Sequence, residues 1–229
     1  MSYNPNDVNS WGGFCPLIIA HDVGRSRDRS TAVVGGNSPH GRRLLGVAAA
    51  EGLPQNLFGS SRAAALAAVD GRYQHNGLIV ADLSNDATYG EILLETFGRR
   101  VVGLQISRYG DGMGCEQRAT KHGMLPVYTI GRTILLELFH SELQSDAVRL
   151  SNAPNIRRAY EQLANLEVEH REGGTVYQCA PGEHDDLGIS LAMLAWAAQH
   201  PHLRSWNRNI EVARCPRRAK PTNSWAAWT

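Results

Sequence analysis

The stretch GEHDDLGISLAMLAWA, residues 182–197, predicts a helix that is buried along most of its length. From Leu187 onward apolar side chains fill nearly every face of the helix, and a helix that is apolar all round belongs inside a core. Three polar residues, His184, Asp185 and Asp186, precede the apolar run. One aspartate is enough to cap a helix, because it accepts a hydrogen bond from a free backbone N–H. The second aspartate raises the question of whether other carboxylates meet this pair in space.

Length and composition indicate one globular domain with at most a small appendage. The chain has 229 residues, of which 42% are hydrophobic and 20% are charged. A formal net charge of +1 argues against a uniformly basic nucleic-acid binder, although local basic patches are compatible with it. The four cysteines form no CxxC pair, so spacing alone builds neither a zinc knuckle nor a redox dithiol. Signal-peptide and membrane-spanning patterns are missing, and we expect a cytoplasmic protein without a membrane partner.

Three short apolar segments follow a polar leader at residues 1–14. They are CPLIIAHD (15–22), STAVVGG (30–36) and RRLLGVAAAEG (42–52), and turn-forming residues separate them. We expect three antiparallel strands connected as hairpins. The Ala-rich segment 60–75 predicts the first helix.

A strand–helix–strand unit is predicted next, over 77–84, 88–98 and 101–107, with parallel strands and a right-handed crossover. After this unit we expect mostly helices. The segment that contains Arg118, Lys121 and His122 is expected to be a basic connector that could face DNA. The remaining predicted elements are helices at 133–143 and 155–166, a hairpin of strands 166–172 and 175–180, and the buried helix in the stretch 182–197. The fold class is therefore α/β, with a central mixed sheet of three antiparallel strands followed by parallel strands, flanked by helices over residues 15–202.

The C-terminal tail, residues 203–229, differs in composition from the rest of the chain. Its basic residues are Arg204, Arg208, Arg214, Arg217, Arg218 and Lys220, against the single acidic Glu211, and Trp206, Trp225 and Trp228 lie between them. Three interpretations stay open. The tail is a solvated terminal segment, an arm in which basic side chains contact phosphates and aromatic rings stack, or a packing segment whose tryptophans cover the core.

Acidic residues end two of the predicted strands. Asp22 ends the first strand and Asp82 ends the fourth. Polar residues at the carboxyl ends of adjacent strands point into one crevice, so the two carboxylates converge if the strands are neighbours. A buried helix packed beside them brings Asp185 or Asp186 to the same place. Three carboxylates at one point repel one another unless a positive charge lies between them, and a divalent metal supplies it economically.

Carboxylate oxygens are hard ligands that select Mg²⁺ or Mn²⁺ over zinc or copper. Two such ions about 4 Å apart bind the attacking water and the leaving oxygen of a phosphodiester. The pattern therefore indicates nuclease chemistry. Each aspartate alone is more typical of a turn, and it is the order of all three motifs that carries the prediction.

These motifs resemble those of the ribonuclease-H-like nuclease superfamily, and more closely the nuclease domain of tailed-phage terminase large subunits. IIAHDVGRSRDRSTAVV (18–34) is similar to the first-strand motif of that family, and LIVADLSNDATYGEILLETF (78–97) is similar to the second. The stretch 182–197 is similar to the third motif, in which His-Asp-Asp opens an apolar helix. The resemblance runs from about residue 15 to about residue 200 and implies a ribonuclease-H-like fold.

The resemblance implies catalytic roles for Asp22, Asp82 and Asp185. Asp22 would be a ligand shared by two Mg²⁺ or Mn²⁺ ions, Asp82 a ligand of one and Asp185 a ligand of the other. Asp186 would serve instead of Asp185 or as a further ligand, and the sequence leaves this open. His184 either hydrogen-bonds a carboxylate or the phosphate, or is merely exposed. The arginines of the loop after Asp22 either contact phosphate or form a solvated turn; they are Arg25, Arg27 and Arg29.

The chain departs from this family because it contains no GxxxxGK[ST] loop for binding ATP phosphates. We expect a metal-dependent endonuclease that acts on double-stranded DNA in viral DNA packaging, beside a separate packaging ATPase and portal, in the cytoplasm of a bacterial host. The chain would be an excised nuclease domain or a free-standing protein, and the polar leader at Met1 slightly favours a complete reading frame. A Holliday-junction resolvase and a non-catalytic DNA-binding or assembly module of the same fold remain the alternatives.

Overall fold

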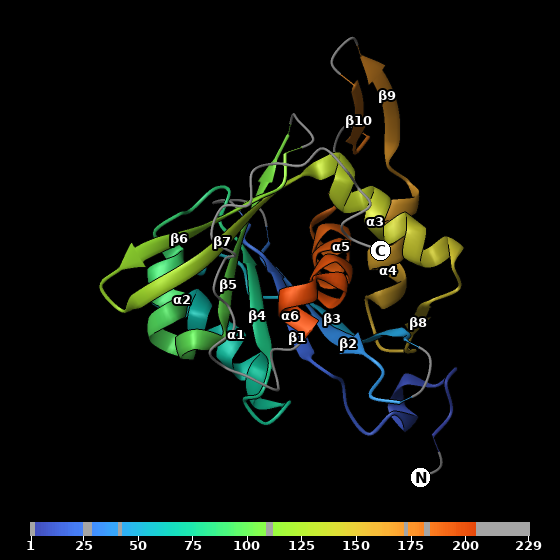
Figure 1. Cartoon of the computed structure of the whole chain (residues 1–229), viewed down its shortest axis with the longest axis horizontal. Helices are drawn as coiled ribbons and strands as arrows, with labels where there is room; N and C mark the ends of the chain where they lie inside the picture. Colours follow the sequence, from blue (N-terminus) through green and yellow to red (C-terminus); the bar gives the residue numbers. More distant parts are fainter. Residues whose placement is uncertain are drawn as a thin grey trace.

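An eight-stranded mixed sheet forms the centre of the protein, in the order β6-β7-β5-β4-β1-β2-β3-β8. The structure is a computed structural model, and it describes residues 3–24, 29–40, 43–108, 112–171, 174–180 and 184–204 (Figure 1). The strands are β1 (Leu17–Asp22), β2 (Thr31–Asn37), β3 (Leu45–Gly52), β4 (Leu78–Asp82), β5 (Val101–Ser107), β6 (Gly114–Thr120), β7 (Gly123–Gly131) and β8 (Val148–Leu150). The helices are α1 (Gly59–Gly71), α2 (Tyr89–Phe97), α3 (Arg132–Gln144), α4 (Ile156–Ala164), α5 (Asp186–Gln199) and α6 (Pro201–Arg204), with 3-10 turns at Val8–Ser10 and Gly98–Arg100.

The strand pairing confirms the predicted mixed sheet. β1 pairs antiparallel with β2, so that Asp22 lies opposite Thr31, and parallel with β4, so that His21 lies opposite Ala81. β2 and β3 form the second antiparallel pair, and β4 and β5 are the parallel strands of the predicted strand–helix–strand unit. The α/β fold class is therefore as the sequence predicts.

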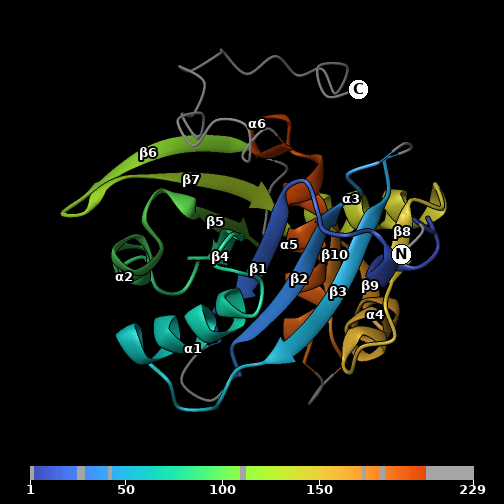
Figure 2. The ribbon, with the colours of Figure 1, turned by 90° about the horizontal axis from the view of Figure 1, so that it is seen from below.

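Two layers of helices cover the sheet. α1 and α2 lie on one face, whereas α5, flanked by α3 and α4, lies on the other (Figure 2). Successive residues of β1 alternate between the two cores: Ile18 packs with the α5 side and Ile19 with the α1 side. This is why β1 is apolar from Leu17 to Ala20, as expected for a central strand that is buried on both faces. Every residue of α5 from Leu187 to Ala198 is buried, as the all-round apolar pattern predicts.

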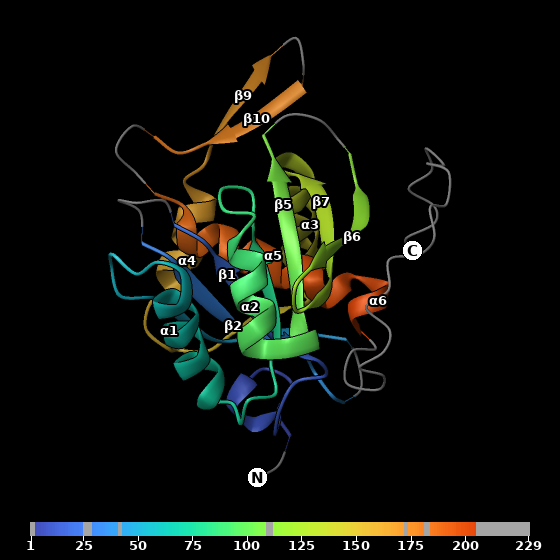
Figure 3. The ribbon, with the colours of Figure 1, turned by 90° about the vertical axis from the view of Figure 1, so that its left-hand side faces the viewer.

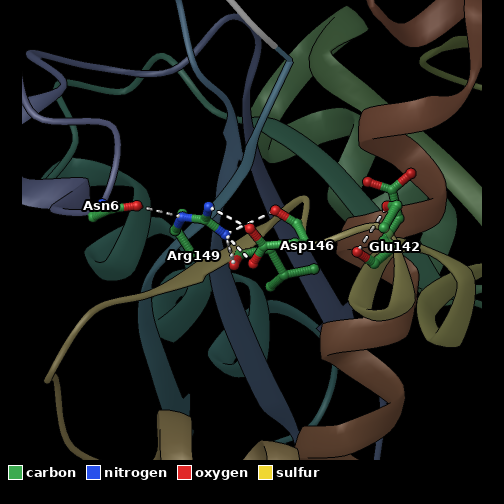
Figure 4. Close-up of polar contacts among 6 residues, drawn as sticks. Asn6, Glu142, Asp146 and Arg149 are labelled. Carbon is green, nitrogen blue, oxygen red and sulfur yellow. Dashed lines mark hydrogen bonds and ion pairs between the residues drawn. The ribbon is translucent and has the colours of Figure 1, made fainter.

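The N-terminal segment packs onto the domain. Trp11 is 1% exposed and forms a small apolar cluster with Val8. Nε of Arg149 donates a hydrogen bond of 3.1 Å to Oδ1 of Asn6, while the same guanidinium pairs with the Asp146 carboxylate (Figure 4). These contacts connect the chain before β1 to the region around β8.

Between β5 and α3 the structure differs from the sequence prediction. The expected basic connector is instead the antiparallel pair of β6 and β7, in which Arg118 lies on β6 and Lys121 and His122 form the turn. β7 pairs parallel with β5, and β6 forms the edge of the sheet.

The predicted hairpin near residue 173 is present as β9 (Glu167–Arg171) and β10 (Gly174–Gln178). It projects away from the sheet (Figures 1 and 3). Among the helices in the described ranges, none has the length and apolar character needed to span a bilayer.

Candidate functional site

Asp22 and Asp82 end two neighbouring parallel strands, β1 and β4, at the same edge of the sheet. Strands that run side by side in the same direction present their last residues to one crevice. Asp82 is 7% exposed and Asp22 is partly buried. The structure therefore brings together the two strand-end carboxylates that the sequence singles out.

The start of α5 lies against the same edge, and a line of hydrogen bonds holds it there. The backbone N–H of Asp22 donates to Oγ of Ser190 at 3.1 Å, and the hydroxyl of Thr31 donates to the backbone oxygen of Asp186 at 3.0 Å. The hydroxyls of Ser190 and Thr31 are 2.7 Å apart. Since the Thr31 proton is committed to Asp186, Ser190 is the donor to Thr31. This line of bonds links the backbone of Asp22 to that of Asp186.

The carboxylates of this edge share one electrostatic environment. Burial raises the pKa of Asp22 well above its ordinary value, and the negative charges of Asp82, Asp186 and Asp185 raise it further. Burial also raises the pKa of Asp82, opposed by hydrogen bonds from Ser84, whose backbone N–H lies 2.8 Å from Oδ1 and whose hydroxyl also donates to it. The aspartates from β4 and α5 are therefore near enough to Asp22 to disfavour its charged form.

A cation from α3 completes the cluster. The guanidinium of Arg132 forms an ion pair with Asp185, and its positive charge lowers the pKa of both Asp22 and Asp82. Asp185 occupies the N-cap position of α5, yet its side chain makes no capping hydrogen bond. The simple capping interpretation is therefore wrong for the Asp185 side chain, which is directed to Arg132.

A thiol also contacts Asp185. Burial raises the pKa of Cys179 to about 12, with further contributions from the charge of Asp185 and from a hydrogen bond with its carboxylate. A thiol with a pKa this high stays protonated at neutral pH. Cys179 therefore acts as a hydrogen-bond donor to Asp185.

The donor chemistry of the cluster fits a hard divalent cation. Buried carboxylates that repel one another provide oxygen ligands and an unbalanced negative charge, which Mg²⁺ and Mn²⁺ satisfy. In the part of the chain that the structure describes, no group of three or more His, Cys, Asp or Glu side chains is already arranged around a single point as metal ligands. The assignment of Asp22, Asp82, Asp185 and Asp186 as ligands therefore stays a prediction.

The other predicted contacts lie around or beyond this cluster. His184 is exposed just before Asp185, and Arg29 is exposed just before β2. Arg25 and Arg27 are outside the described residues, and the described part of the tail ends at Arg204. The tail residues outside it are Trp206, Arg208, Glu211, Arg214, Arg217, Arg218, Lys220, Trp225 and Trp228.

Sequence reasoning missed three residues of the site: Arg132, Ser190 and Cys179. Arg132 directly follows the carboxyl end of β7, so the strand-end rule that selects Asp22 would have selected it if β7 had been predicted. Ser190 is the one polar side chain between Leu187 and Ala198, and a lone hydroxyl in a buried helix signals a specific partner. We find no sequence signal that distinguishes Cys179.

The sheet order and the helical layers are those of a ribonuclease-H-like α/β domain. Comparison with solved structures identifies domains of similar fold. The chain matches no protein-family model and no curated protein sequence. It is similar to the large terminase nuclease of thermophilic phage G20c with bound magnesium, at a TM-score of 0.53 and 19% identity, over 78% of this chain and 79% of that one.

A second structure of the same phage nuclease matches at a TM-score of 0.52 and 17% identity, over 85% of this chain and 84% of the other. The large terminase nuclease domain of a Thermus phage matches at a TM-score of 0.52 and 19% identity, over 86% and 82% of the two chains. The chain therefore has the fold of phage large-terminase nuclease domains, which confirms the fold that the sequence resemblance implies.

Proposed function

We propose that the protein is a metal-dependent DNA endonuclease that hydrolyses phosphodiester bonds with two divalent ions, Mg²⁺ or Mn²⁺. The observation that carries the proposal is the meeting of Asp22 and Asp82 with the start of α5, where the aspartates raise the pKa of Asp22 by their charge. A similar solved nuclease contains bound magnesium, which supports the choice of metal.

The side chains of the site would hold and orient the metal ions rather than exchange protons with the substrate. Asp22 would hold the ions together with the aspartates whose charges act on it, and the hydrogen bonds of Ser190 and Thr31 would keep it aligned with α5. Ser84 would orient Asp82, since it donates two hydrogen bonds to one carboxylate oxygen. When bound, the two ions activate the attacking water and stabilise the leaving oxygen.

The proposed substrate is double-stranded DNA, and the proposed setting is viral DNA packaging or processing. The nuclease fold of phage large terminases supports this setting. The proposed partners in this setting are a packaging ATPase and a portal; the 229 residues themselves contain no GxxxxGK[ST] sequence.

Cleavage of supercoiled plasmid DNA in Mg²⁺ or Mn²⁺ tests the proposal. Asp22→Asn and Asp185→Asn each remove the charge of one proposed ligand. We expect both variants to lose detectable cleavage, while thermal unfolding shows that they are still folded. Asp146→Asn is the matched control, because the Asp146 side chain is 80% exposed and pairs with Arg149 away from the site. Near-normal cutting by a folded Asp22→Asn variant would show that the proposed metal site is wrong.

A further inference from the structure

Arg132 is the cation that the structure places against the acidic site. Its guanidinium pairs with Asp185, and its charge offsets those of Asp22 and Asp82 as well. One guanidinium carries a single positive charge, whereas the four aspartates of the site carry up to four negative charges when ionised. Arg132 therefore neutralises part of the negative charge that two divalent ions would neutralise in full.

The position of Arg132 is set by the fold. It is the first residue of α3 and directly follows β7. Its Nε donates a hydrogen bond of 3.3 Å to the backbone oxygen of Tyr177, and the hydroxyl of the next residue, Thr133, donates to the backbone oxygen of Thr175 at 2.9 Å. Both acceptors lie on β10, so the start of α3 is held against that strand. The guanidinium is therefore fixed next to Asp185 rather than free in solvent.

The ion pair and a metal ion need the same carboxylate. The Arg132 and Asp185 side chains are 23% and 17% exposed, so water screens their attraction only in part. A carboxylate oxygen that accepts a hydrogen bond from the guanidinium cannot bind a metal ion from the same direction. The positive charge of the guanidinium also repels a divalent ion that approaches Asp185. Cys179 donates a further hydrogen bond to this carboxylate. A divalent cation that binds Asp185 must therefore displace the guanidinium from its carboxylate.

We propose that Arg132 is the resident counter-ion of the acidic site and competes with a divalent cation for Asp185, so that the chain's own guanidinium weakens metal binding there. This inference rests on the proposed metal-dependent function. Without metal, Arg132 stabilises the fold by offsetting carboxylate repulsion. With metal, the cation takes over that charge and the guanidinium is displaced from Asp185.

Calorimetric titration of the full chain with Mn²⁺, without DNA, tests the competition. The variants are Arg132→Gln, which removes the charge, and Arg132→Lys, which keeps it. Arg157→Gln is the matched control, because Arg157 also pairs with a carboxylate, Glu161 at 2.7 Å, but its side chain is 91% exposed on α4. We expect Arg132→Gln to bind Mn²⁺ about tenfold more tightly than the wild type, because the repulsion between the guanidinium and the divalent ion is removed. Arg132→Lys and the control should stay within about threefold of the wild type, because Lys retains the competing charge.

Each outcome decides the matter. Equal or weaker Mn²⁺ binding by Arg132→Gln overturns the competition, and so does an equal gain in affinity by Arg132→Lys. If Arg132→Gln does not fold without metal, circular dichroism should show that Mn²⁺ restores the fold. Failure to fold at any Mn²⁺ concentration would mean that the guanidinium is only structural, which also overturns the proposal. If neither wild type nor variant binds Mn²⁺, the proposed function itself fails, whereas wild-type binding that the variant leaves unchanged removes only this inference.

Discussion

Replacing Ser190 with alanine should both destabilise the protein and disturb the acidic site. The Ser190 side chain is completely buried, and its hydroxyl accepts from the backbone N–H of Asp22 and donates to Thr31. Loss of two buried hydrogen bonds costs about 2 kcal/mol, since each contributes about 1 kcal/mol. Alanine is the better helix former and returns about 0.5 kcal/mol. We therefore expect the free energy of unfolding to fall by about 1.5 kcal/mol, which lowers Tm by about 3–6 °C for a chain of this size.

Urea unfolding of the metal-free protein measures this loss, and Mn²⁺ titration provides a second readout. Because the hydroxyl aligns α5 with β1, the Ser190→Ala variant should bind Mn²⁺ more weakly by about tenfold. Ser61→Ala, at an exposed position of α1, is the control and should change stability by less than about 0.5 kcal/mol. A Ser190→Ala variant as stable as the wild type, with unchanged Mn²⁺ affinity, would refute the structural role of this hydrogen-bond line.

Two further predictions concern acid stability and the basic tail. Burial lowers the pKa of His200 from 6.5 to about 4. Between these two pH values the unfolded chain therefore binds more protons than the folded protein, and the free energy of unfolding falls by about 3 kcal/mol as the pH is lowered. Urea unfolding at pH 7.5 and pH 4 should show a smaller loss of stability in the His200→Gln variant than in the wild type. An identical pH dependence of the free energy of unfolding in both proteins would contradict this prediction. Deletion of residues 205–229 should weaken DNA binding and flatten its dependence on salt, because each phosphate contact contributes about 0.9 to the slope of log affinity against log salt. An unchanged slope, with an unchanged melting temperature, would leave the solvated-segment interpretation of the tail.

The sequence by itself determined the elements whose patterns are local. The apolar run after Leu187 is buried whatever packs against it, and the strand ends at Asp22 and Asp82 follow from short apolar segments that stop at a charge. The parallel unit of β4 and β5 follows from its crossover helix. These features depend on hydrophobic period and turn chemistry, which a single sequence contains.

The strands β6 and β7 were not predictable in the same way. β6 is a polar edge strand without an apolar run, and β7 contains Pro126, which normally argues against a strand inside a sheet. Pro126 is tolerated because the pairing of β7 with β5 begins only at Val127, so the proline lies opposite Gln117 of β6 alone. Strand pairing over this distance depends on register, and register is a property of the assembled sheet.

The tertiary structure also decided the partners of the acidic residues. Asp185 and Arg132 are 53 positions apart, and Asp22 and Ser190 are 168 apart. Helix capping, which the sequence indicates for an aspartate before an apolar helix, is a local interaction, whereas the ion pair that Asp185 makes requires α3 to start beside α5. The sequence thus determined which residues carry charge at the ends of elements. Only the packing of the helices on the sheet decided which charges meet, because the energy of an ion pair depends on distance and burial rather than on chain order.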